Sequence, residues 1–177
     1  MKRLGVMVGL ASGLLNGTAR SQENFAALLL KNSLSFTQPN EFSAVAVVDN
    51  PDVRYQFAMR STVAKAEIRY AIFPSSNNDE VAAGFLQTIC LNISNGKSCD
   101  IRPFPQPAVK AEFGADGGFT SVTALDSKFG KGFTYCMVNL IYKNGVADVA
   151  IFFMFDDVKV MPSLVTQERV FHALRFK

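Results

Sequence analysis

The sequence predicts an α+β fold in which an antiparallel β-sheet of about six to seven strands is sandwiched between helices. Residues 133–157 hold two long apolar runs that meet at Asn144-Gly145, a dipeptide typical of tight β-hairpin turns. Neither run alternates between apolar and polar residues, which indicates central strands covered on both faces. Residues 77–93 add the apolar periodicity of a covering helix.

The central hairpin is expected to close through a two-residue type I′ turn, because Asn and Gly both accept positive φ. Asn144 and Gly145 would then both show positive φ. This turn fixes the register of the two strands, and it pairs Lys143 with Val146, Leu140 with Val149, and Val138 with Ile151.

The first third of the chain predicts a short helix followed by a meander of strands. The helix is expected at residues 23–31, and the strands at residues 34–37, 42–48, 53–60 and 65–73. The last two strands alternate between apolar and polar or charged residues. We therefore expect at least part of one face of this meander to be exposed to solvent.

The covering helix has a predicted start and a predicted end. Asn77 followed by Glu80 has the spacing of a capping box, and Asn95-Gly96 is a typical helix stop. Downstream, three prolines at positions 103, 105 and 107 argue against regular structure. A short helix at residues 108–113, a strand at 119–125 and a closing helix from Pro162 complete the order, with Leu164, Phe171 and Leu174 on one face of that helix.

Residues 1–21 have the pattern of a signal peptide. Lys2-Arg3 is followed by an apolar stretch, and Ala19-Arg20-Ser21 has the small-x-small form that precedes cleavage. The alternative is an ordinary N-terminal helix. The signal predicts a single domain at residues 22–177 that is exported to the periplasm or outside the cell. No stretch reaches the roughly 20 apolar residues of a transmembrane helix.

Charge argues against a nucleic-acid partner. The chain has 18 basic and 15 acidic residues, and cleavage would remove Lys2, Arg3 and Arg20 but no acidic residue. A mature domain with 15 of each has no electrostatic attraction to phosphate backbones or to anionic lipid.

Cys90 and Cys99 bracket a short loop and would be able to form a disulfide in an oxidising compartment. The alternative is two unpaired thiols. Cys136 lies in a predicted central strand, where a buried apolar thiol is expected.

The residues that most enzymes need are scarce. His172 is the single histidine, which excludes zinc or iron sites built from several histidines. No G-x-S-x-G motif is present, and the S-x-x-K match at Ser94–Lys97 lacks its companion motifs. Asp116 and Asp156-Asp157 do not have EF-hand spacing. We expect no catalytic residues, no metal and no cofactor.

One group of polar residues could form a binding site on the exposed face of the meander. If Arg60 lies near Lys65 across a turn, that face carries Arg54, Gln56, Arg60, Glu67 and Arg69. Three guanidinium groups on a rigid sheet could hold a carboxylate or phosphate. The alternative is a solvated face with cross-strand Glu–Arg pairs.

The order of elements resembles the family that includes the photosystem II extrinsic protein PsbP, the Ran-binding MOG protein and DcrB-like exported bacterial proteins. The resemblance is carried by Leu34-Ser35-Phe36-Thr37 with Pro39 and Phe42, by Glu67-Ile68-Arg69-Tyr70 running to Phe73-Pro74, by Phe129-Gly130, and by Ala173-Leu174-Arg175-Phe176-Lys177. It implies an α/β/α sandwich and, for an exported bacterial member, a binding or assembly role that is not assigned. It supplies no catalytic residues and no specific partner.

The functional hypothesis is therefore an exported, non-catalytic binding or assembly module for a protein or cell-envelope partner. The 16 Phe residues motivate an alternative, a carrier of a small apolar or anionic ligand in a pocket between the sheet and a helix. A weaker alternative is a hydrolase that uses neither histidine nor metal.

Overall fold

The computed structural model describes residues 23–51 and 53–177. The expected signal peptide and its cleavage site lie outside these described residues. Within them, no helix is long and apolar enough to cross a membrane.

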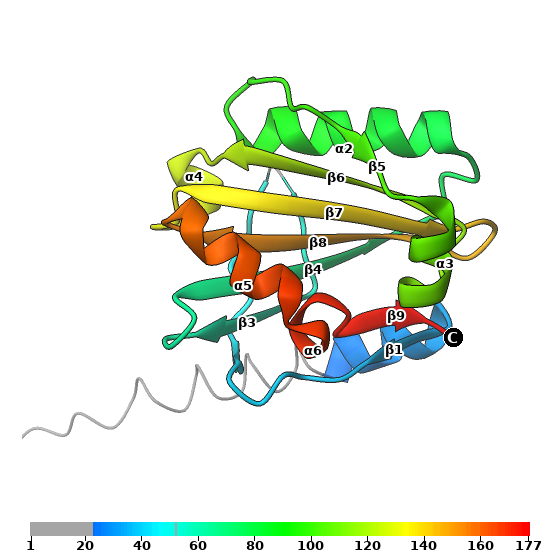
Figure 1. The fold of residues 1–177 in the computed structure, drawn as a ribbon, viewed down its shortest axis with the longest axis horizontal. Coiled ribbons are helices and arrows are strands. Elements are labelled where there is room, and N and C mark those ends of the chain that lie inside the picture. The colour runs from blue at the N-terminus through cyan, green and yellow to red at the C-terminus, as the bar shows by residue number, and fades with distance from the viewer. Residues whose placement is uncertain (1–22, 52) are drawn as a thin grey trace, which may run out of the picture.

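A seven-stranded antiparallel sheet forms the centre of the molecule (Figure 1). Its strand order is β2 (Ser43–Val45), β3 (Phe57–Ser61), β4 (Ala66–Phe73), β8 (Ala147–Phe155), β7 (Tyr135–Lys143), β6 (Gly117–Ala124) and β5 (Arg102–Pro103). A separate two-stranded sheet pairs β1 (Leu34–Phe36) with β9 (Leu174–Phe176). The predicted α+β fold class is confirmed.

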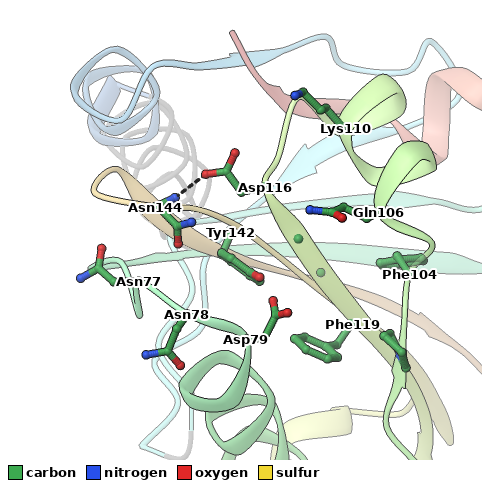
Figure 2. Close-up of a pocket in the computed structure, with 13 residues that line it drawn as sticks. Asn77, Asn78, Asp79, Phe104, Gln106, Lys110, Asp116, Phe119, Tyr142 and Asn144 are labelled. Atoms are coloured by element: carbon green, nitrogen blue, oxygen red, sulfur yellow. Dashed lines mark hydrogen bonds between the residues drawn. The ribbon is translucent and has the colours of Figure 1, made fainter.

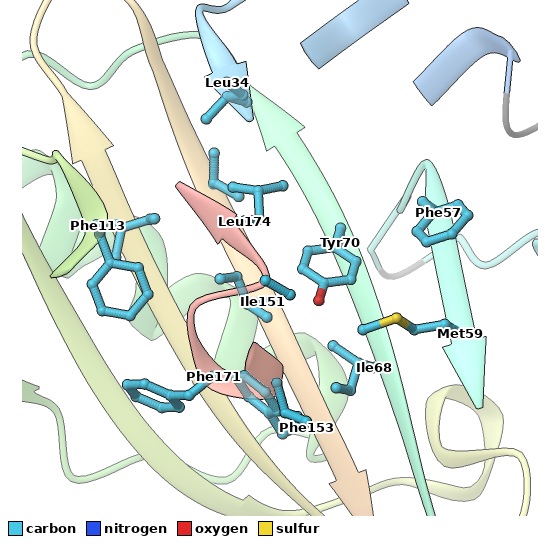
Figure 3. Close-up of a cluster of buried hydrophobic side chains, with 14 of the residues drawn as sticks. Leu34, Phe57, Met59, Ile68, Tyr70, Phe113, Ile151, Phe153, Phe171 and Leu174 are labelled. Carbon is cyan, nitrogen blue, oxygen red and sulfur yellow. The ribbon is translucent and has the colours of Figure 1, made fainter. Parts of the chain in front are cut away.

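Helices cover both faces of the sheet and create two apolar cores. On one face lie α2 (Asp79–Ile93) and α4 (Ser127–Gly130), and on the other lie α3 (Gln106–Phe113), α5 (Met161–Thr166) and α6 (Glu168–Phe171). Residues 23–31 are helical, and Phe25 packs into the core on the side of α3, α5 and α6. Figure 3 shows this core, where Phe153 of β8 and Phe171 of α6 stack with ring centroids 5.7 Å apart.

The central hairpin confirms the doubly covered strands but corrects their register. All nine residues of β8 are buried. Gly145 has positive φ (71°) whereas Asn144 does not, and the Val146 N–H donates to the Lys143 carbonyl at 2.9 Å. A positive φ at the second central residue alone is the pattern of a type II turn. Because Val146 joins the loop, pairing shifts by one residue: Lys143 with Ala147, Leu140 with Ala150, and Val138 with Phe152.

The start of α2 also differs by one residue from the prediction. The Asn78 side chain accepts from the Val81 N–H at 2.9 Å, so Asn78 is the N-cap. Asn77 has positive φ (63°) and its Oδ1 accepts from the Gly145 N–H at 2.8 Å. Asn77, which was predicted to cap the helix, instead links the segment before α2 to the hairpin turn.

The closing segment is not one helix. A 3₁₀ turn (Val158–Val160) precedes α5, and an extended Gln167 (φ −83°, ψ 93°) separates α5 from α6. Leu174 was expected on a helix face but lies in β9, where it pairs with Phe36. The last residues form backbone hydrogen bonds with β1. These bonds stabilise a strand more than a further turn would stabilise a helix that is already interrupted at Gln167.

Proline in the 103–107 segment did not prevent all regular structure, because β5 includes Pro103. β5 is an edge strand of only two residues. An edge strand tolerates proline, since the missing N–H can face outward.

Two glycine substitutions test the hairpin turn. A Cβ would meet open space at both Gly145 and Gly84, but Gly145 has positive φ while Gly84 lies in α2. We expect Gly145→Ala to lower the free energy of unfolding by about 1–2 kcal/mol. The control Gly84→Ala should raise it by up to about 1 kcal/mol. Urea denaturation measures both, and changes of the same sign would contradict the turn geometry.

Candidate functional site

The predicted arginine face is only partly exposed to solvent: Arg54 and Arg60 are exposed, whereas Glu67 and Arg69 of β4 are buried. The strand register places Arg60 opposite Glu67. Glu67 accepts from Arg69 Nε at 2.7 Å and from Arg60 Nε at 2.8 Å. Arg69 is 2% exposed and Glu67 is 3% exposed. The two arginines are therefore already paired with a carboxylate of the protein.

The remaining donors and faces of Arg69 are also in contact with protein groups. Its Nη1 donates to the Phe129 carbonyl at 2.7 Å. Its guanidinium carbon lies 4.8 Å from the centroid of the Tyr55 ring and 4.9 Å from that of the Phe129 ring. Hydrogen bonds and aromatic rings therefore compensate the buried charge of Arg69.

Arg54 and Gln56 do not join this cluster as an anion site. Gln56 Oε1 accepts from the Ile72 N–H at 2.8 Å, across the start of β3. Arg54 is exposed. Of the five predicted residues, the structure brings together Arg60, Glu67 and Arg69, in the cross-strand ion pairing that was the alternative hypothesis.

A different site lies at the end of the sheet where the β7–β8 hairpin turns. We call it the end pocket, a cavity of about 700 Å³. Four segments meet there: the start of α2, the β5–α3 connection, the start of β6 and the end of β7 (Figure 2). It is lined by Asn77, Asn78, Asp79, Pro103, Phe104, Gln106, Lys110, Asp116, Gly117, Gly118, Phe119, Tyr142 and Asn144.

Two glycines of β6 allow the strand to approach its neighbours closely at this pocket. A Cβ at Gly117 would lie 2.2 Å from the Tyr142 hydroxyl oxygen, and one at Gly118 would lie 2.9 Å from the Leu140 carbonyl oxygen and 3.1 Å from the Phe104 ring. Close packing thus explains two of the three glycines of the 114–118 segment, and Gly114 ends α3 at positive φ. The segment matches no nucleotide-binding motif.

The Tyr142 ring is buried in the sheet, and its hydroxyl reaches the end pocket. Tyr142 is 4% exposed, and none of the described residues forms a hydrogen bond with its hydroxyl. In Figure 2 the hydroxyl points toward the space beside Asp79. Tyr142 falls within the apolar runs of the central hairpin, where no sequence pattern indicates that a side chain ends at a cavity.

The charged residues of the end pocket are two carboxylates and one amine. Asp116 Oδ2 accepts from the Asn144 N–H at 2.9 Å, which links β6 to the hairpin turn. Asp79 is the first residue of α2, where a negative charge stabilises the helix dipole. Lys110 extends from α3 on the opposite side (Figure 2).

The segment that carries Asn77 and Asn78 is held down by a buried carboxylate. Asp148 is 1% exposed, and its Oδ1 accepts from the Ser76 N–H at 3.0 Å. Burial raises the pKa of Asp148 above its ordinary value, and the hydrogen bonds from Ser76 lower it in part. The position of the pocket rim thus depends on a group that burial pushes toward protonation.

A second cavity, of about 540 Å³, contains the histidine. His172 Nε2 lies 2.9 Å from Glu112 Oε2, and the imidazole packs edge-on to Phe113 at 4.9 Å between centroids. Thr37 also lines this cavity, but no described hydroxyl or thiol is hydrogen-bonded to the imidazole. The two partners are 60 residues apart, so no local motif announces the pair.

Two of the three cysteines form a disulfide, and the third is a free thiol. Cys90 of α2 is bonded to Cys99, and Cys136 is free and buried. Burial raises the pKa of the Cys136 thiol, and the nearby Arg69 charge lowers it in part. Within the described residues, no group of three or more His, Cys, Asp or Glu side chains is arranged to hold a metal ion.

The buried ion pair predicts unequal effects of two substitutions. Glu67→Gln leaves the Arg69 charge buried without a carboxylate, which we expect to lower the free energy of unfolding by about 3–5 kcal/mol. The control Arg60→Ala removes a partner whose side chain is 46% exposed, and should cost less than about 1 kcal/mol. Equal losses in urea denaturation would contradict a buried Glu67–Arg69 pair.

Asp148 predicts a pH dependence of stability. Because its pKa is raised in the folded protein, the folded state keeps a proton that the unfolded chain has already lost. The free energy of unfolding should therefore fall as the pH rises from about 4 through the raised pKa. Asp148→Asn preserves an acceptor for Ser76 and should make this fall shallower. Urea midpoints between pH 4 and 7 measure it, and identical slopes would refute the assignment.

Comparison with known proteins supports the fold. No family model matches this chain, and no curated protein matches it. The chain is similar to the solution structure of cyanobacterial PsbP (CyanoP) from Synechocystis sp. PCC 6803, with a TM-score of 0.51, 11% identity, and coverage of 83% of this chain and 88% of that one. At this identity the similarity concerns the fold alone, and the protein has a PsbP-like fold.

Proposed function

We propose that the protein is an exported, non-catalytic binding module that engages a protein or cell-envelope partner at the end pocket. The observation that carries the proposal is the Tyr142 side chain, which is 4% exposed and whose hydroxyl opens on the end pocket with no hydrogen-bond partner among the described residues. A rigidly held hydroxyl of this kind is free to bind a group that enters the pocket. A ligand atom in the end pocket would supply the missing partner.

The composition of the end pocket supports binding rather than chemistry. Its lining contains no Ser, Thr, Cys or His, the side chains that most covalent catalysis uses as nucleophile or base. Of its two carboxylates, Asp116 already accepts from a backbone N–H. The His172–Glu112 pair lies in a separate cavity.

Export is supported by two independent features. Residues 1–21 have the pattern of a signal peptide, and Cys90 is bonded to Cys99. Disulfides persist in oxidising compartments such as the periplasm and the cell exterior. The PsbP-like fold is compatible with an accessory role and contributes no partner.

The carrier hypothesis has less support from the core. The Phe residues that motivated it pack against one another: Phe25 stacks on Phe57 at 4.6 Å between centroids, and Phe113 packs edge-on to Phe171 at 5.6 Å. Such contacts are those of a filled apolar core.

Site-specific photocrosslinking tests the proposed function. A photoreactive residue replaces Lys110, on the rim of the end pocket, in the full chain expressed in its own cells. The control position is Val63, which is 87% exposed in the β3–β4 turn at the opposite end of the sheet. We expect an envelope component to crosslink at position 110 and not at 63, and Tyr142→Phe in the same chain to abolish it.

Three results would overturn this function. They are equal crosslinking at both positions, no crosslinking at position 110, or turnover in a broad hydrolase screen that Tyr142→Phe removes. The substitution deletes one hydroxyl that no described residue binds, so folding should be preserved, and an unchanged melting temperature verifies that.

A further inference from the structure

We propose that the end pocket binds a neutral oligosaccharide through the Tyr142 hydroxyl, Asp79 and Gln106. This inference rests on the binding role proposed above and adds the chemical class of the ligand. Three properties of the pocket carry it: its charge balance, its hydrogen-bonding groups and its aromatic walls.

The charge balance argues for an uncharged ligand. Asp79 and Asp116 give two negative charges, and Lys110 gives one positive charge. The start of α2 adds the partial positive charge of a helix dipole, and Asp79 lies at that position. An anion would meet two carboxylates, and a cation would meet the helix start and Lys110. Neither sign of charge finds a complementary site.

The hydrogen-bonding groups suit hydroxyls, which both donate and accept. The Tyr142 hydroxyl can do either, a carboxylate such as Asp79 accepts, and the Gln106 amide does both. These three side chains make no hydrogen bond with the described residues, and Figure 2 shows them around the same space. A ligand with several adjacent hydroxyls can satisfy all of them at once.

The walls suit the apolar faces of sugar rings. Phe104 and Phe119 are half-buried and line the cavity with Tyr142. Sugar rings present C–H groups on their faces and hydroxyls at their edges, so aromatic walls combined with planar polar side chains match both. Between these walls the lining includes Gly117 and Gly118, over which the Tyr142 and Phe104 rings pack closely.

The size of the cavity is appropriate for a ligand of this kind. Its 700 Å³ lies in the range of roughly 300–1,000 Å³ found for small-molecule sites. A purely apolar ligand would displace water from the Tyr142 hydroxyl and the Asp79 carboxylate without replacing its hydrogen bonds, which costs binding free energy.

An NMR titration with defined probes tests the ligand class. Protein purified after expression of the full chain is titrated with cellotriose and chitotriose, both neutral. Trigalacturonate serves as the anionic probe and spermidine as the cationic probe. We expect at least one neutral trisaccharide to shift the Gly117 and Gly118 amide signals, and Tyr142→Phe to weaken its binding about tenfold or more.

Tyr70→Phe is the matched control. The Tyr70 hydroxyl has no partner either, but it is fully buried in the core that contains β1 and β9. Its removal should leave saccharide binding unchanged. Equal weakening by both substitutions would contradict a contact at Tyr142, as would unchanged binding by Tyr142→Phe.

Other results separate this inference from the binding role. Shifts by trigalacturonate or spermidine alone would overturn the saccharide assignment. If no neutral trisaccharide binds while crosslinking at position 110 still depends on Tyr142, the saccharide assignment fails and the binding role stands. If that crosslinking is also absent, both the saccharide assignment and the binding role are wrong.

Discussion

The pairing of β8 with β4 on one side and β7 on the other is the interaction on which the rest of the structure depends. All nine residues of β8 are buried, as are seven of the eight residues of β4. A strand buried on both faces needs an apolar layer above and below it. The chain supplies α2 and α4 on one side, and on the other α3, α5, α6 and the β1–β9 pair. The small β1–β9 sheet thus packs against one face of the large sheet and covers part of it.

Double coverage also determines the fate of polar side chains on the sheet. Glu67 and Arg69 lie on the face that α2 and α4 cover, so their charges must be compensated inside the protein. Phe129 of α4 does this with its carbonyl and its ring. Asp148, on the same face, is compensated by the Ser76 N–H. The polar residues of the central strands therefore hold α4 and the segment before α2 in place.

The sequence was informative where a pattern is local. Alternation and doubly apolar strands predicted the sheet, and Asn144-Gly145 located the hairpin. Prediction failed where two local backbone conformations of the same residues differ little in free energy. A two-residue and a three-residue turn both place Gly145 at positive φ, yet they shift the register by one residue. Adjacent Asn77 and Asn78 both had the side chain of an N-cap.

Prediction failed more completely where a contact joins distant segments. The pairing of β9 with β1 and that of His172 with Glu112 have no local signature. The burial of Glu67 and Arg69 was missed for a related reason. Strand alternation shows which residues share a face, but Arg69 is covered by Phe129, which is 60 residues away, and by the Tyr55 ring, which the alternation assigned to the opposite face.

The end pocket follows from the same constraint, because it lies where coverage of the sheet stops. α2 begins at this end of the sheet, and β5 ends after two residues, where the chain leaves the edge for α3. The start of β6 consequently lies between a helix start and a loop, with glycines where packed side chains would otherwise stand. Tyr142 extends from the buried strand β7 into this gap. A rigid strand thus holds a polar group at the one point of the α2 face where the covering layer gives way to the end pocket, and such preorganisation lowers the entropic cost of binding a ligand.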